Sequence, residues 1–176
     1  MFTELETDRL YLRNISLKDR GFIFKQFSCE KVTQYLFDVE PLTSIQDADK
    51  IIAFYVKPEP RLQHRWVIVE KESGATIGTC GFHVWDRKEN CCDVGYDLYP
   101  DFWHKGYTSE AMKSILAFAK ENMNVQRIDA RIFPNNRSSV KLAEKLGFIF
   151  LGQTKDEVFC GEKYLHKIYS LNLAAE

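Results

Sequence analysis

The chain has 176 residues, of which 45% are hydrophobic and 14% aromatic, and its 24 Lys and Arg against 25 Asp and Glu give a net charge of −1. This length and composition predict one domain, residues 1–176, with enough apolar material for a core, and they disfavour a disordered chain. The near-zero charge argues against nucleic-acid binding as the main task, because phosphate backbones select proteins with a clear basic excess.

The sequence also argues against a membrane or metal-dependent protein. The longest apolar run, at 51–56, is far shorter than the ~18 residues of a membrane span, and the charged N-terminus has no apolar signal core. Five cysteines without a CxxC pair favour a reduced, cytoplasmic protein. The four His are scattered and there is no HExxH, so we expect no metal site.

The first predicted elements are a strand and two helices. Apolar and polar residues alternate over 9–13, which predicts a half-buried strand. Capping-box patterns at 16–19 and 44–47 predict the starts of two helices, the first ending near Cys29 and the second before Pro58.

Three strands and a helix are predicted next. Residues 65–70 and 75–85 flank a Gly-containing turn and predict a hairpin, and 92–99 predicts a third strand. An apolar stripe over residues 109–121 predicts a helix, and the alternation over 127–133 predicts a strand.

A short helix is predicted over 137–146, ending at a left-handed Gly147. Residues 148–152, then residues near 156–160 and 164–173, supply the last strands. The order β-α-α-β-β-β-α-β-α-β-β mixes strands and helices without strict alternation. It predicts an α+β fold with helices on both faces of the sheet.

The stretch 92–112 is the most informative about chemistry. A strand runs through a short loop, 101–106, directly into a helix, and a helix start offers unpaired N–H groups and a favourable dipole to an anion. Gly106 would let the backbone approach the anion closely, and Lys105 would add charge. The alternative is an ordinary strand-to-helix connection in which the glycine only relieves a turn.

A second candidate site lies at the start of the helix over 137–146. Asn136 is a favourable N-cap and Ser139 occupies the third helical position, so both could contact a ligand there. Arg137, Lys141 and Lys145 form one basic edge that suits a phosphate. The alternative is a capped surface helix with a solvated basic face.

Together these stretches resemble the GCN5-related N-acetyltransferase (GNAT) superfamily. Its acyl-CoA loop pattern, Q/R-x-x-G-x-G/A, falls on residues 103–108, where Gly106 matches while Trp103 and Thr108 depart from it. The run 106–111 resembles the G-Y-x-T/S-E-A run of the ribosomal-protein-alanine N-acetyltransferase (Rim-type) branch.

Three further segments carry the same resemblance. Residues 6–13 resemble the E-T-x-R-L-x-L-R opening of that branch, and 93–96 resemble its acidic-apolar-Gly-Tyr strand. Residues 136–148 resemble N-x-x-S followed by G-F. The similarity covers about residues 5–173.

The resemblance implies a single-domain α+β fold with a mixed, mostly antiparallel central sheet and helices on both faces. It also implies an acetyl-CoA-dependent N-acetyltransferase that acts by direct attack of a primary amine, from a protein N-terminus or a small molecule, in a ternary complex. The backbone of 103–108 would hold the pyrophosphate, and the strand before it would splay from the next and pair with the pantetheine amides. The implied acetyl-CoA-binding residues are Leu98, Tyr99, Trp103, His104, Lys105, Gly106, Tyr107, Thr108, Asn136, Arg137, Ser139 and Lys141.

The reaction needs a base for the amine, because amines are largely protonated near pH 7. Asp93, at an often acidic position of the family pattern, is the expected catalytic base, with Asp97 on the same strand face as the reserve. The usual family tyrosine acid would fall on Ala143. Ser139 is therefore the expected hydrogen-bond donor to the leaving thiolate.

Other readings stay open at this point. The chain could be a CoA-binding sensor or partner protein of this fold with little catalytic activity. A route through an acyl-cysteine at Cys91 or Cys92 and an acid role for Tyr164 or Tyr169 are alternatives. The acceptor is not readable from the sequence, and a homodimer is an expectation from the family alone.

Overall fold

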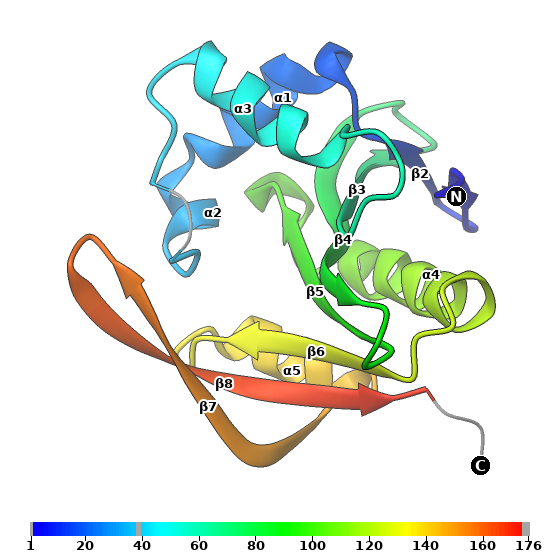
Figure 1. Ribbon diagram of the computed structural model, residues 1–176. Helices are drawn as coiled ribbons and strands as arrows, with labels where there is room; N and C mark the ends of the chain where they lie inside the picture. Colours follow the sequence, from blue (N-terminus) through cyan, green and yellow to red (C-terminus); the bar gives the residue numbers. More distant parts are fainter. Residues whose placement is uncertain (1, 38–39, 174–176) are drawn as a thin grey trace.

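A computed structural model describes residues 2–37 and 40–173, and these residues form one eight-stranded sheet (Figure 1). Its strands lie in the order β1-β2-β3-β4-β5-β6-β8-β7. Every neighbouring pair is antiparallel except β5 and β6, which are parallel. The strands are β1 (Leu5–Glu6), β2 (Leu10–Asn14), β3 (His64–Glu70), β4 (Thr76–Asp86), β5 (Cys91–Leu98), β6 (Arg127–Ile132), β7 (Ile149–Phe159) and β8 (Glu162–Asn172).

Helices cover both faces of this sheet, which confirms the predicted α+β class with a mixed, mostly antiparallel sheet (Figure 1). Two 3-10 turns, η1 (Leu17–Asp19) and η2 (Pro100–Phe102), precede helices. The helices are α1 (Arg20–Phe27), α2 (Glu30–Thr33), α3 (Ile45–Tyr55), α4 (Tyr107–Asn122) and α5 (Arg137–Lys145).

The two faces of the sheet bury separate apolar cores. Helices α1 and α3 pack through Ile23, Phe27 and Ile52 on Val67 of β3. On the other face, α4 and α5 contribute to a larger cluster that includes Trp66 and Phe82. Because successive residues of a strand point to opposite faces, β3 contributes Val67 to the first core and Trp66 and Ile68 to the second.

Local signals place most helix ends correctly. Both predicted capping boxes form: the Asp19 carboxylate accepts from the Ser16 N–H at 2.8 Å, and the Asp47 carboxylate accepts from the Ser44 N–H at 3.2 Å. Gly147 ends α5 with a left-handed φ of 89°. These ends are fixed by contacts within a few residues, which is why sequence patterns find them.

Some element boundaries differ from the prediction. The short β1 and α2 were not expected, because two and four residues carry too little periodicity. Helix α4 begins at Tyr107, two residues before the predicted start. The strand segments predicted at 148–152 and near 156–160 belong to one strand, β7, whose pairing with β8 shifts near Gly152.

The feature that positions the site is a divergence between β5 and β6. The two strands pair only from Cys91 opposite Arg127 to Asp93 opposite Asp129. Beyond Asp93, β5 continues beside β4 while β6 turns away (Figure 1). The splay expected from the family resemblance is therefore present, and one edge of residues 94–98 has no partner strand among the described residues.

Candidate active site

The loop between β5 and α4 presents its backbone to a ligand. His104 and Gly106 are both left-handed, with φ of 61° and 82°, and Gly106 is the N-cap of α4 without a side-chain cap bond. The N–H groups of residues 104–108 donate to no backbone carbonyl in the described part of the chain. A run of free N–H groups at a helix start is suited to a phosphate or pyrophosphate.

Trp103, which departs from the family pattern, anchors its side chain at the end of β5. Its indole N–H donates to the carbonyl of Leu98 at 2.6 Å, which ties the loop to the end of β5. The Tyr107 side chain points into the core and donates to Glu70 at 3.0 Å, so only its backbone faces the loop.

The open edge of β5 carries further free backbone groups. Tyr99 donates its N–H to Ile77 on β4, whereas the Leu98 carbonyl faces Trp103 on the other side. Because backbone polar groups alternate between the two edges of a strand, Val94 and Tyr96 also direct theirs into the splay. An extended amide-bearing chain can pair there as an added strand.

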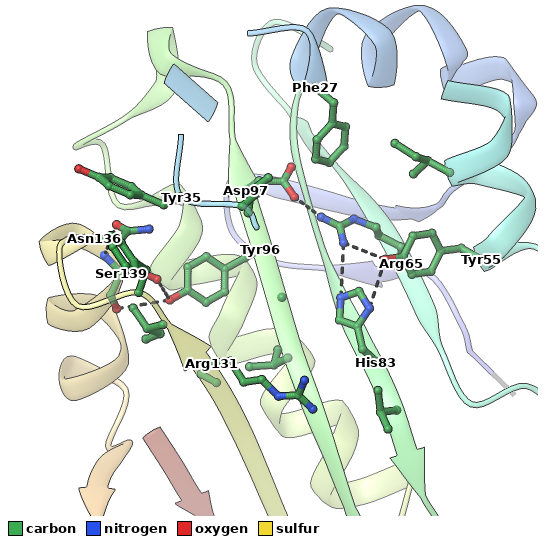
Figure 2. A pocket seen from close by; sticks show the side chains of 18 of the residues that line it. Phe27, Tyr35, Tyr55, Arg65, His83, Tyr96, Asp97, Arg131, Asn136 and Ser139 are labelled. Carbon is green, nitrogen blue, oxygen red and sulfur yellow. Dashed lines mark hydrogen bonds and ion pairs between the residues drawn. The ribbon is translucent and has the colours of Figure 1, made fainter. Parts of the chain in front are cut away.

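The start of α5 faces the same splay. The Asn136 side chain accepts from the Ser139 N–H at 3.2 Å, which confirms the predicted N-cap. The Ser139 hydroxyl lies 2.6 Å from the Tyr96 hydroxyl (Figure 2). Burial raises the pKa of Tyr96 to about 12, with the Ser139 hydrogen bond opposing part of the rise. The phenol therefore stays protonated near neutral pH.

Two cavities meet at this hydroxyl pair. The smaller, of about 220 Å³, runs from the loop and Leu98 to α5. The larger, of about 540 Å³, lies between β4, β5 and the helices α1 and α3. The residues that line both are Tyr35, Leu36, Tyr96, Asp97, Asn136 and Ser139.

A buried polar cluster lies against the larger cavity (Figure 2). Arg65 on β3 forms an ion pair with Asp97 on β5 and donates to the Thr79 hydroxyl at 2.7 Å, and Thr79 donates to Asp97 at 2.9 Å. Arg65 also donates to the Tyr55 hydroxyl at 3.1 Å. Asp97 is therefore held in an ion pair and hydrogen bonds, so it is a poor candidate for the free base that was expected as a reserve.

His83 on β4 completes this cluster. Its Nδ1 lies 3.2 Å from the Tyr55 hydroxyl, and its ring lies over Gly95, where a Cβ would come within 2.7 Å of Nε2. Burial first, and then the charges of Arg65 and Arg131, lower the pKa of His83 to about 3. The imidazole is therefore neutral near pH 7 and presents a polar, uncharged wall to the cavity.

Asp93, the expected base, lies at the closed end of the splay. It forms an ion pair with Arg131 on β6, which also binds Glu157 at 3.2 Å. Burial raises the pKa of Asp93 above its ordinary value, although Arg131 opposes this rise. Arg131 lines the larger cavity, whereas Asp93 does not.

The structure brings only part of the predicted donor-binding set to the cavity wall. The members that line the smaller cavity are Leu98, Trp103, His104, Asn136 and Ser139. Lys105, Gly106 and Thr108 adjoin it on the loop and the first turn of α4. Tyr99 instead packs under the Lys25 ammonium, 4.3 Å from its ring centroid. Arg137 and Lys141 are exposed on α5 and line neither cavity.

Sequence reasoning missed four residues of the site: Tyr55, Arg65, His83 and Tyr96. Tyr96 stood within a noted motif, but its contact with Ser139 spans 43 residues. A buried Arg in an otherwise apolar strand was an available signal at Arg65. Its partner could not be identified without the strand register, which brings Thr79 and Asp97 to the same face.

The cysteine alternatives find no support in this geometry. Cys91 and Cys92 line neither cavity, and burial raises the pKa of both thiols. A thiol is nucleophilic only as its thiolate, so neither is activated. Tyr164 and Tyr169 also lie outside both cavities. Within the described residues, no cluster of three or more His, Cys, Asp or Glu could hold a metal ion.

Free N–H groups at a helix start, an open strand edge and two adjoining cavities suit a transferase that holds a phosphate-bearing donor beside a second substrate. Comparison with known proteins agrees. The family model described as Acetyltransferase (GNAT) domain matches residues 9–149. An uncharacterized N-acetyltransferase of Bacillus subtilis, YoaA, is 33% identical over 173 residues, which cover 97% of each chain.

Two solved structures share the fold. RimL, a ribosomal L7/L12 alpha-N-protein acetyltransferase in complex with coenzyme A, has a TM-score of 0.86 at 16% identity, over 97% of this chain and 98% of that chain. Spermidine N-acetyltransferase from Vibrio cholerae, in complex with CoA and spermine, has a TM-score of 0.82 at 19% identity, over 95% and 97% of the chains.

The chain belongs to the GNAT family of acetyltransferases. It is therefore an N-acetyltransferase that uses acetyl-CoA as the acyl donor and an amine as the acceptor. This family membership favours the enzyme over a CoA-binding sensor without catalysis. No helix within residues 2–37 and 40–173 is both long and apolar enough to span a membrane.

Proposed function

We propose that acetyl-CoA lies along the smaller cavity with its thioester at the Tyr96–Ser139 pair, and that a primary amine enters through the larger cavity. The observation that carries this assignment is that the two cavities share Tyr96, Asn136 and Ser139. A donor and an acceptor that meet at one pair of hydroxyls are placed for direct transfer in a ternary complex.

The residues present fit the donor. The free N–H groups of 104–108 would bind the pyrophosphate, and Gly106 lets it approach the start of α4. Val94, Tyr96 and Leu98 border the splay into which the pantetheine amides would pair. Arg137 and Lys141, on the exposed side of α5, are the proposed contacts of the distal phosphate.

The chemistry follows from three groups. Asp93 accepts the proton of the attacking amine through water, because its raised pKa makes it a stronger base than an ordinary carboxylate. The free N–H groups of Val94 and Tyr96 polarise the thioester carbonyl. Tyr96 and Ser139 then hydrogen-bond the leaving thiolate, and Tyr96 gives it a proton that the phenol regains from solvent.

The larger cavity favours an acceptor with a single amine and a neutral or apolar body. Its described aromatic lining comprises Phe27, Tyr35, Phe54, Tyr55, Tyr96 and Phe133. Among the described lining residues the only carboxylate is Asp97, which is already paired with Arg65, and the cationic Lys50 and Arg131 are paired with carboxylates outside the lining. An approaching ammonium can rest on aromatic faces, but a second ammonium meets no carboxylate in this lining that lacks a cationic partner.

We expect peptide N-termini and simple primary amines to be acetylated with a kcat/KM at least about tenfold above that for spermidine, since one unfavourable charge contact costs on the order of 1.4 kcal/mol. Thiol release from acetyl-CoA, measured over a panel of peptides, amino acids and polyamines, tests both the activity and this preference. Thiol release at background with every amine would contradict the proposed transfer, and a preference for spermidine would contradict the proposed acceptor.

Acetyl-CoA at ~100 times its dissociation constant is expected to stabilise the fold by ~2.7 kcal/mol, because it binds the folded chain alone. For a chain of this length that corresponds to a Tm increase of about 5–10 °C. Differential scanning calorimetry checks it. Dephospho-CoA is the matched ligand: a smaller shift is expected if Arg137 and Lys141 hold the distal phosphate, and an equal shift would remove them from the site.

Two further parts of the proposal concern the setting of the enzyme. The cysteines of the described chain are all free thiols, which supports a reduced, cytoplasmic compartment. A homodimer stays a prediction from the family resemblance, and light scattering after size-exclusion chromatography tests it.

A further inference from the structure

Thr7–Arg9 and Glu110 belong to two segments that carry the family resemblance but have no role so far. They meet beside the loop of residues 104–108. The turn between β1 and β2 places Arg9 against the first turn of α4, 101 residues away in the sequence. The Arg9 Nε donates to the Glu110 carboxylate at 2.7 Å, and the Arg9 backbone N–H donates to it at 2.9 Å. The Thr7 hydroxyl adds a third bond at 2.6 Å.

The same guanidinium also holds the loop itself. Arg9 Nη1 donates to the Lys105 carbonyl at 3.1 Å, and the guanidinium lies over the Tyr107 ring, 4.5 Å from its centroid. In a trans peptide the carbonyl and the following N–H point in opposite directions. Arg9 therefore fixes the 105–106 peptide so that the Gly106 N–H points away from it, to the side on which an anion can bind.

Charge gives Arg9 a second effect. Glu110 is an anion in the first turn of α4, where it is stabilised by the helix dipole but would repel a pyrophosphate at the same helix start. Arg9 neutralises that carboxylate through a salt bridge of 2.7 Å. Burial alone would raise the pKa of Glu110, but hydrogen bonds from Thr7 and Arg9 lower it, so the carboxylate is charged and needs this partner.

We propose that Arg9 is a positioning residue for the acyl donor: it orients the Lys105–Gly106 peptide and neutralises Glu110, so that the start of α4 can accept the pyrophosphate of acetyl-CoA. The inference rests on the proposed function, in which residues 104–108 bind that pyrophosphate. The Arg9 side chain is 47% exposed, and half-exposed ion pairs contribute little to global stability. Its replacement should therefore leave the fold intact.

The test compares two donors in one assay. Arg9→Met keeps an aliphatic side chain over Tyr107 but removes the charge and the guanidinium N–H donors to Glu110 and to the Lys105 carbonyl. It is expected to raise KM for acetyl-CoA about tenfold, the effect of one charge-assisted interaction, with kcat within about twofold. With S-acetylpantetheine, which has no pyrophosphate, KM should not change.

Three variants sharpen the result. Arg9→Lys keeps the charge but not the fork that reaches both Glu110 and Lys105, so it should restore KM only in part. Arg9→Met with Glu110→Gln should bind acetyl-CoA better than Arg9→Met alone, because no unpaired carboxylate remains. Arg20→Met is the control, since its ion pair with Asp49 is equally exposed, at 46%, and lies on α1 and α3 away from the loop.

The outcomes distinguish a failure of the role of Arg9 from a failure of pyrophosphate binding by residues 104–108. An equal rise in KM for both donors, or no rise for either, would overturn the role of Arg9. A wild-type enzyme that uses acetyl-CoA no better than S-acetylpantetheine would instead overturn the pyrophosphate assignment of residues 104–108. Circular dichroism and the Tm of each variant confirm that folded proteins are compared.

Discussion

Tyr96→Phe is expected to lower kcat about a hundredfold while KM for acetyl-CoA stays near its wild-type value, since general acid catalysis contributes roughly 10²–10⁴ in rate. Phenylalanine keeps the ring in its packing and removes only the hydroxyl that lies 2.6 Å from Ser139. The raised pKa of Tyr96, about 12, keeps that proton in place for the thiolate across the neutral range. Initial rates of thiol release at saturating acetyl-CoA give the result.

Ser139→Ala should reduce kcat to a similar or smaller extent, and the double variant should lose no more than Tyr96→Phe alone, because the two hydroxyls act as one unit. Tyr164→Phe is the matched control: its ring stacks on Phe37 at 4.1 Å and lies outside both cavities, so its kcat should not change. Additive losses from Tyr96 and Ser139 would contradict their joint action. An unchanged kcat in Tyr96→Phe would show that Tyr96 is not the acid that protonates the leaving thiolate.

Asp93→Asn is expected to lower kcat about a hundredfold at pH 7, with the deficit shrinking above pH ~8, where an α-amino acceptor loses its proton unaided. In the wild-type enzyme the rate should rise as the Asp93 carboxyl loses its proton, and burial places that rise at a higher pH than for an ordinary carboxyl. Asp93→Asn should lack this rise. Its rate should instead increase with pH in proportion to the fraction of the acceptor amine that is unprotonated. Profiles of kcat against pH with a peptide acceptor measure both.

Glu157→Gln is the control for Asp93, because it removes the other carboxylate bound to the same Arg131 guanidinium. Glu157→Gln should keep the rise of kcat with pH that the wild type shows. Both variants should bind CoA as the wild type does. Parallel pH profiles for the wild type and Asp93→Asn would show that Asp93 is not the base. The next candidate would then be a water held by the neutral His83 and Tyr55 in the larger cavity.

The sequence patterns that succeeded were local ones. Asn136 was identified as an N-cap and Gly147 as a left-handed helix end, because caps and left-handed turns depend on contacts within about four residues. The predicted site was less complete. The strand carrying Tyr96 was correctly expected to border the splay, but alternation alone does not say that Tyr96 faces α5 while Asp97 faces β3.

The sequence by itself determined the α+β class, the family and the N-cap of α5, since each depends on near neighbours or on a motif. Only the tertiary structure decided which side chains share the reaction space. Arg65 meets Asp97 across 32 residues, and Arg9 meets Glu110 across 101. Such contacts depend on strand register and on the point where β5 and β6 separate, and a one-residue shift in register would turn each strand's side chains to the opposite face.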